Sequence, residues 1–182
     1  VACPRASARC PRHADTAFPA LSGWLGHDAP FDFEPAYRPG AGIERMRVGT
    51  PPVLAMAALD AALDVWDRVD MADLRARSVA LSEMFITGVE AACPMLTLAS
   101  PRDPSRRGSQ VSFRFKEGYA AMQALIARGV IGDFRAPDIM RFGFTPLYVG
   151  EAEVRAATRI LTEVMQGRLW DDPAHRRRNA VT

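Results

Sequence analysis

The sequence has little lysine and no long apolar run. Among the 23 Lys and Arg residues of this 182-residue chain, only Lys116 is a lysine, so chemistry that needs a lysine amine has one candidate. No apolar stretch approaches the roughly 18 to 20 residues that a membrane-spanning helix needs. The first twenty residues hold Pro, Arg, His and Asp where a secretory signal would be apolar. We therefore expect a cytoplasmic protein that does not bind membranes.

Cysteine is also scarce. Cys3, Cys10 and Cys93 are odd in number and fit reduced thiols better than a disulfide framework. Cys3 and Cys10 together with His13 could form part of a zinc site, but a closed site needs four ligands and the other histidines lie far away in the sequence. We therefore expect no bound metal.

Charge of neither sign dominates. The 23 basic and 21 acidic residues are spread along the chain and give a net charge of +2, so no strong field attracts nucleic acid. Arg102, Arg106 and Arg107 share one polar stretch, but no aromatic platform accompanies them. This favours a solvated turn, and we expect no nucleic-acid partner.

The first part of the chain has few regular elements. Residues 1–42 are rich in Pro and Gly and are expected to be irregular. The imperfect alternation of apolar and charged side chains over 43–48 predicts a short strand. Thr50, followed by two prolines, is expected to act as the N-cap of a helix over 52–68. Since a self-sufficient domain rarely opens this way and the chain starts with Val1, we expect a piece of a longer protein.

From Asp70 onward the pattern predicts a domain of about 110 residues. Asp70 is the expected N-cap of a helix that runs to about Ala92. Further elements follow in the order strand, strand, helix, strand, strand, helix, over residues 95–98, 110–115, 117–128, 130–134, 139–144 and 151–166. This order is typical of an α+β layer in which helices cover one face of a small sheet.

Three features could bind a ligand. Strand, glycine, hydroxyl and helix N-terminus follow one another around Thr50, which suits a phosphate, but the spacing alone favours the alternative that Thr50 only caps the helix. Arg141 is a charged residue inside an apolar strand, and it either reaches solvent or binds a carboxylate through its planar fork. Trp24 lies in a glycine-flanked loop, where it either contacts a ligand or plugs a core.

Several blocks taken together resemble kynureninase, a pyridoxal-phosphate (PLP) enzyme family of the aspartate-aminotransferase fold type. The likeness runs from about Pro19 to Met165 and concerns only the C-terminal portion of the family. It rests on residues 21–27 (LSGWLGH), 49–52 (GTPP), 107–113 (RGSQVSF), 128–135 (RGVIGDFR) and 139–148 (IMRFGFTPLY). The resemblance implies a PLP transferase-like α/β fold, with the end of the large PLP-binding domain and a connecting helix at 1–69 and the α+β small domain at 70–182.

The resemblance also implies a function. Kynureninases hydrolyse L-kynurenine to anthranilate and L-alanine in the kynurenine pathway of tryptophan catabolism, which feeds NAD biosynthesis, and they act as homodimers with a shared active site. By this likeness Trp24 and Thr50 bind the phosphate of pyridoxal 5'-phosphate, Thr50 across the dimer interface. Arg141 is then the residue that holds the substrate α-carboxylate. No residue of this chain is implied to be catalytic.

Two departures from the family pattern matter. The family's Schiff-base lysine belongs to the upstream part of the enzyme, and Lys116 does not match it, so we expect this chain alone to be inactive. Leu25 stands where several members carry an aromatic residue. Two alternatives stay open: a cysteine desulfurase-like PLP enzyme, which needs a nucleophilic cysteine on a loop whereas Cys93 is at a predicted helix end, and a non-catalytic remnant that serves only as a dimerisation or binding module.

Overall fold

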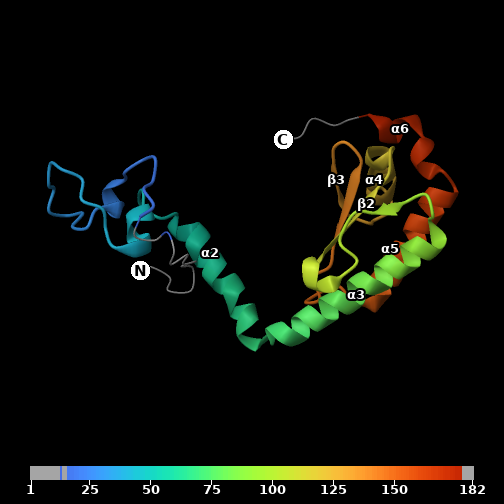
Figure 1. Ribbon diagram of the computed structural model, residues 1–182, viewed down its shortest axis with the longest axis horizontal. Helices are drawn as coiled ribbons and strands as arrows, with labels where there is room; N and C mark the ends of the chain where they lie inside the picture. The colour runs from blue at the N-terminus through green and yellow to red at the C-terminus, as the bar shows by residue number, and fades with distance from the viewer. Residues whose placement is uncertain (1–12, 14–15, 178–182) are drawn as a thin grey trace. The chain divides into compact units, whose positions relative to one another are not determined.

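The chain divides into two compact units, Val1–Val69 and Asp70–Thr182, which we call unit 1 and unit 2. The structure is a computed structural model, and it describes residue 13 and residues 16–177 (Figure 1). Cys3 and Cys10 lie outside the described residues. Within the described part, no three or more His, Cys, Asp or Glu side chains are grouped so that they could hold a metal ion.

Unit 1 contains short helical turns in place of the expected strand. Its elements are the 3-10 helices η2 (Trp24–Gly26), η3 (Gly42–Met46) and η4 (Asp64–Arg68) and the α-helix α2 (Val53–Leu63). The prediction of a strand over 43–48 is wrong, because Arg45 turns inward. Its Nε donates a hydrogen bond to the Gly40 carbonyl at 3.1 Å, and the residue is buried. A strand would have alternated this side chain to the exposed face.

Thr50 does not cap α2, contrary to the prediction. The helix begins at Val53, its N-cap is Pro52, and no side chain caps it. A residue that precedes a proline is disfavoured in the α region, so Pro51 and Pro52 delay the start of the helix. No residue of α2 is buried in this structure. The apolar side chains of this helix are therefore not part of a buried core in this chain.

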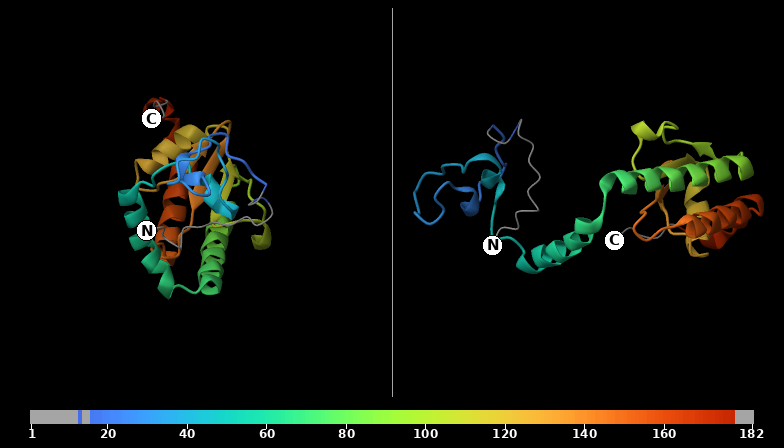
Figure 2. Two further views of the ribbon diagram at one scale, coloured as in Figure 1. Left: turned by 90° about the vertical axis from the view of Figure 1, so that its left-hand side faces the viewer. Right: turned by 90° about the horizontal axis from the view of Figure 1, so that it is seen from below.

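Unit 2 starts as predicted. The helix α3 (Met71–Ala92) is capped by Asp70, whose side chain accepts hydrogen bonds from the backbone N–H of Ala72 and Asp73 at 2.8 and 3.0 Å. Extended backbone at Val69 separates this helix from η4 (Figure 2).

The sheet of unit 2 has four antiparallel strands in the order β1-β2-β4-β3. They are β1 (Thr97–Leu98), β2 (Gln110–Arg114), β3 (Asp133–Arg135) and β4 (Ile139–Gly143). The third strand begins later than predicted, because the N–H of Val130 donates to the Leu125 carbonyl at 3.0 Å and so stays bound to the preceding helix. The order of elements predicted for this region is confirmed.

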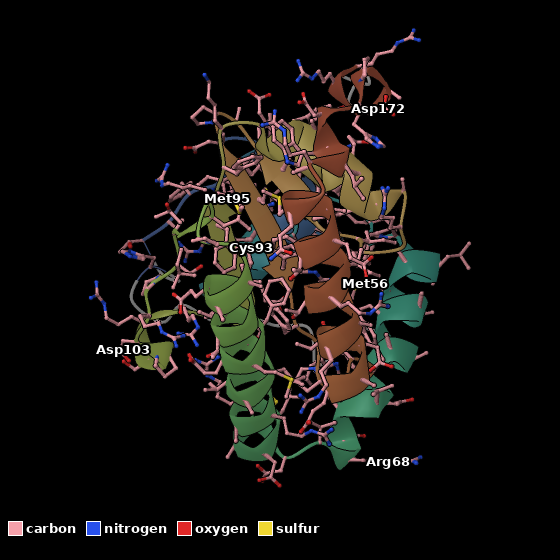
Figure 3. The ribbon with its side chains drawn as sticks, turned by 90° about the vertical axis from the view of Figure 1, so that its right-hand side faces the viewer. Met56, Arg68, Cys93, Met95, Asp103 and Asp172 are labelled. Atoms are coloured by element: carbon pink, nitrogen blue, oxygen red, sulfur yellow. The ribbon has the colours of Figure 1, made fainter. Side chains whose placement is uncertain are left out.

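Helices α3 and α5 run side by side (Figures 1 and 3). The helices that follow β2 are α4 (Gly118–Ile126), α5 (Glu151–Gln166), η6 (Leu169–Asp171) and α6 (Pro173–Arg176). At the centre of the core, the ring of Phe85 lies 6.1 Å from that of Phe113, 5.0 Å from Phe142 and 5.3 Å from Phe144. The α+β prediction is confirmed. None of the described helices is long and apolar enough to cross a bilayer.

The prediction that Arg107 lies in a solvated turn is wrong. Its side chain is only 2% exposed, it forms an ion pair with Glu83 of α3, and its Nη1 donates to the Pro101 carbonyl at 3.1 Å. Arg75 of α3 donates to the Arg107 carbonyl at 2.9 Å. Arg102 remains half-exposed. The loop that carries η5 (Pro104–Arg106), with Asp103 at the side of α3 in Figure 3, is therefore fastened to that helix by a buried guanidinium.

Candidate functional site

Within unit 1, the loop that carries Trp24 lies against the segment that leads to Thr50. A Cβ atom added at Gly23 would overlap the backbone of Val48, including its carbonyl. Only glycine allows two backbones to approach this closely. Gly23, which precedes Trp24, therefore lies beside Val48, which is two positions before Thr50. The fold thus brings together two segments that are about 25 positions apart in the sequence.

The start of α2 offers unused hydrogen-bond donors. The first intrahelical bond runs from Met56 N–H to the Pro52 carbonyl, so the N–H groups of residues 53–55 have no partner inside the helix. Thr50 is exposed, and no hydrogen bond of its side chain is found among the described residues. An ester phosphate has charge and acceptor oxygens that match these groups. The residues present therefore fit a phosphate.

Trp24 is half-exposed and has a fixed neighbour. Its ring lies 5.7 Å from that of Phe31 at an interplanar angle of 77°. Two hydrogen bonds close the loop over residues 26–38, which contains Phe31. The Asp28 N–H donates to the Arg38 carbonyl at 2.8 Å, and the Tyr37 hydroxyl donates to the Gly26 carbonyl at 3.1 Å. The indole is held by a folded loop and is not part of a core.

In unit 2, Arg141 lies on the polar face of the sheet. Its neighbours along β4, Met140 and Phe142, are buried on the opposite face, as strand alternation predicted. The strand register puts Ser112 of β2 on one side of Arg141 and Asp133 of β3 on the other. The polar side chains of this face include those of residues 110, 112, 114, 133, 135 and 141, and Ile139 and Gly143 lie on the same face.

Arg141 is engaged by a carboxylate of its own chain. Its Nε donates to Oδ1 of Asp133 at 2.5 Å, and its Nη2 donates to Oδ2. The hydrogen bond from Arg141 is the main reason that the pKa of the Asp133 carboxyl lies below its usual range, and the same bond raises the pKa of Arg141. Arg141 therefore forms an ion pair within its own sheet, and its side chain remains 28% exposed.

The sequence pattern did not identify Asp133 as a partner of Arg141. The two residues are eight positions apart, and only the antiparallel register of β3 and β4 sets them opposite each other. The turn of the β3–β4 hairpin could have indicated the pairing, because a charged residue on each strand at matching distance from the turn is a cross-strand ion pair.

A separate apolar pocket of about 320 Å³ opens elsewhere in unit 2. Its lining includes Phe85, Phe142, Phe144 and Ile160 but not Arg141. The one charged lining residue is Glu153, whose carboxylate accepts a hydrogen bond from the Gly150 N–H at 2.9 Å and so caps α5. The carboxylate-binding group and this pocket are therefore distinct features.

Comparison with known proteins gives a consistent answer. Residues 74–161 match a family model described as the kynureninase C-terminal domain. The chain is 48% identical over 174 residues to kynureninase from Pseudomonas fluorescens, and 45% identical over 173 residues to kynureninase from Burkholderia mallei. Each alignment covers 94% of this chain. The resemblance to the C-terminal portion of kynureninase is confirmed.

The chain spans 42% of the length of these kynureninases. Solved structures with a similar fold include the apo cysteine desulfurase from Thermococcus onnurineus NA1, with a TM-score of 0.68 and 18% identity. The superposition covers 86% of this chain and 42% of the desulfurase chain. A C-DES variant with glycine covalently linked to its PLP cofactor gives a TM-score of 0.64 and 23% identity, over 80% of this chain and 38% of that one. At these identities the likeness shows the fold alone, and it agrees with the predicted PLP transferase-like fold.

Proposed function

We propose that this chain serves as the C-terminal portion of a PLP-dependent kynureninase that hydrolyses L-kynurenine to anthranilate and L-alanine. The single observation that carries the proposal is the 45–48% identity to kynureninases over 94% of the chain, through both units. The identity to the cysteine desulfurase from Thermococcus onnurineus NA1 is far lower, at 18%. With this activity the protein would act in tryptophan catabolism and contribute to NAD biosynthesis.

Each predicted site residue receives a role that its surroundings support. Trp24 and Thr50 bind cofactor phosphates in the shared active sites, with Thr50 acting across the dimer interface; their segments meet at Gly23 and Val48, and the N-terminus of α2 follows. Arg141 holds the substrate α-carboxylate, since its planar guanidinium matches a carboxylate and Asp133 takes up only Nε and one donor of Nη2. When it is bound, PLP supplies an electron sink for cleavage of the bond between the side-chain carbonyl and the amino-acid β-carbon.

This chain supplies binding groups, and the rest of the enzyme supplies the reactive amine. Lys116 is the only lysine, and it is exposed immediately beyond β2. An imine-forming lysine is activated by burial or by neighbouring cations, whereas Lys116 is exposed to solvent. We therefore expect the 182-residue chain alone to be inactive toward kynurenine.

We further propose a homodimer with a shared active site, in the cytoplasm. The exposed apolar side chains of α2, with Leu54 87% exposed and Val53 68% exposed, support burial of this helix against other polypeptide in the complete enzyme. The cytoplasmic location is supported by the odd number of cysteines.

A cysteine desulfurase activity is less well supported. Among the described residues Cys93 is the only cysteine, and it is fully buried at the C-terminal end of α3, where its Sγ lies 4.0 Å from Thr162 of α5 (Figure 3). Burial raises the pKa of the Cys93 thiol, which leaves it protonated at neutral pH. A buried, protonated thiol is a poor nucleophile.

The test of the proposed function uses the full-length protein that carries this chain, loaded with PLP. Incubation with L-kynurenine should release anthranilate and L-alanine in equal amounts, with anthranilate followed by its fluorescence. Incubation of the same preparation with L-cysteine should release no sulfide. Release of sulfide from cysteine without release of anthranilate from kynurenine would contradict the proposal.

A further inference from the structure

We infer that Asp133 is a positioning residue for the substrate. It holds one edge of the Arg141 guanidinium, so that the opposite edge, formed by Nη1 and Nη2, faces the incoming α-carboxylate. This inference rests on the proposed function, because it takes Arg141 as the group that binds that carboxylate.

The guanidinium has room for two carboxylates. Of its five N–H donors, Asp133 occupies one on Nε and one on Nη2. Within residues 16–177, no hydrogen bond to the remaining three donors is found. One of these donors lies on Nη2 and two lie on Nη1. The free N–H of Nη2 and one N–H of Nη1 point the same way, so they can donate two parallel hydrogen bonds to a second carboxylate. A substrate carboxylate can therefore bind without displacing Asp133.

The backbone holds Asp133 close to Arg141. The two residues are direct partners in the register of β3 and β4. A Cβ atom added to the preceding Gly132 would lie 2.6 Å from the carbonyl oxygen of Arg141 and 2.8 Å from Cε of Met122. Glycine at this position lets the two strands approach, so the pairing of Asp133 with Arg141 is built into the hairpin.

The local charge still favours an anion. Arg135 lies on the same face, with its Nη2 3.6 Å from Oδ2 of Asp133. Arg135 and Arg141 together with Asp133 sum to one positive charge. Since Arg141 also holds the pKa of the Asp133 carboxyl below its usual range, this balance persists through neutral pH. The carboxylate of Asp133 aligns Arg141 without cancelling the attraction for a substrate carboxylate.

A competing role makes the opposite prediction. If Asp133 had to leave Arg141 before the substrate could bind, it would act as an internal competitor, and its removal would tighten substrate binding. A positioning role predicts weaker binding on removal. The two roles are therefore separated by the sign of the change in KM.

The experiment uses the full-length, PLP-loaded protein with Asp133→Asn and two substrates, L-kynurenine and its carboxamide. We expect KM for L-kynurenine to rise about 10-fold, the effect of misaligning a charge-assisted hydrogen bond. We expect kcat to stay within about twofold and KM for the carboxamide to stay unchanged, because the carboxamide lacks the carboxylate that Arg141 recognises. Asp133→Ser is the second variant if Asp133→Asn does not fold.

Asp138→Asn is the matched control. Asp138 lies on the same hairpin and forms an ion pair with Arg114 at 3.1 Å, so its substitution removes a carboxylate without touching Arg141. We expect this control to have wild-type KM for both substrates. An equal rise in KM with the control, or with both substrates for Asp133→Asn, would show a merely structural role and overturn the inference.

Two further outcomes separate this inference from the proposed function. A lower KM in Asp133→Asn overturns the positioning role and supports competition. Arg141→Ala is measured alongside: if it raises KM for L-kynurenine while Asp133→Asn does not, only the inference about Asp133 fails. If Arg141→Ala leaves KM for L-kynurenine unchanged, the role of Arg141 in the proposed function fails as well.

Discussion

Arg141→Lys separates the charge of this side chain from its shape. Lysine keeps the positive charge, but its ammonium cannot donate two parallel hydrogen bonds to one carboxylate. An ion pair with Asp133 can persist, and both side chains are partly exposed, so we expect little change in the free energy of unfolding. Loss of one charge-assisted hydrogen bond to the substrate should raise KM for L-kynurenine about 10- to 100-fold.

The assay is the initial rate of anthranilate release by the full-length protein at saturating PLP. Cofactor affinity, measured by titration of the apo protein with PLP, should stay at the wild-type value, because Arg141 is not assigned to the phosphate. Arg135→Lys is the matched control: Arg135 lies on the adjacent strand, is 64% exposed and lies 3.6 Å from Asp133. A KM for Arg141→Lys equal to that of wild type or of this control would refute bidentate recognition of the substrate.

Three other predictions concern stability and pH. Phe85→Ala should lower the free energy of unfolding by about 3 to 5 kcal/mol in urea titrations, because Phe85 is 1% exposed and contacts three buried rings; a loss below that of Phe85→Leu would contradict this. Asp70→Ala should cost about 1 kcal/mol by the same measurement, because two N–H groups at the start of α3 lose their acceptor; an unchanged midpoint would argue against the cap. The stability that Asp133 gains from Arg141 should be constant above about pH 5 and be lost only as the pH falls through its lowered pKa, because a carboxyl with a depressed folded-state pKa contributes above its unfolded-state value. Stability curves of wild type and Asp133→Asn that differ more at pH 5 than at pH 7 would contradict the direction of that shift.

Unit 2 was largely predictable from the sequence because local signals agree there. Asp70 is a strong cap, and α5 has the predicted bounds, since its apolar residues repeat at helical spacing. Met140 and Phe142 alternate with Arg141, which was enough to set the arginine on the polar face of the sheet. In these segments propensity and burial favour the same structure.

Unit 1 was less predictable because its local signals depend on close contacts. The segment around Arg45 alternates like a strand, but its guanidinium is drawn to the Gly40 carbonyl and the chain coils. Thr50 has the residue type of a cap, yet two following prolines shift the helix start to Val53. The periodicity of apolar residues indicates neither the Arg45 hydrogen bond nor the later start of the helix.

Two ion pairs were not identified from the sequence. Arg107 looked like one of several solvated arginines, but it is buried against Glu83, which is 24 positions away. Asp133 lies within a block that resembles kynureninase, but its contact with Arg141 depends on the strand register. The Arg107–Glu83 pair depends on the tertiary fold, whereas the Asp133–Arg141 pair follows from the register of one hairpin.

The account depends on two separate binding functions in this chain, one for a phosphate and one for a carboxylate. The most direct test is a paired measurement of the Kd for PLP and the KM for L-kynurenine at saturating PLP in the full-length Thr50→Ala and Arg141→Ala variants. We predict that Thr50→Ala raises the Kd for PLP with little change in KM, and that Arg141→Ala raises KM with little change in the Kd. If either variant changes both constants by the same factor, or if Thr50→Ala leaves the Kd for PLP unchanged, the division of roles is contradicted.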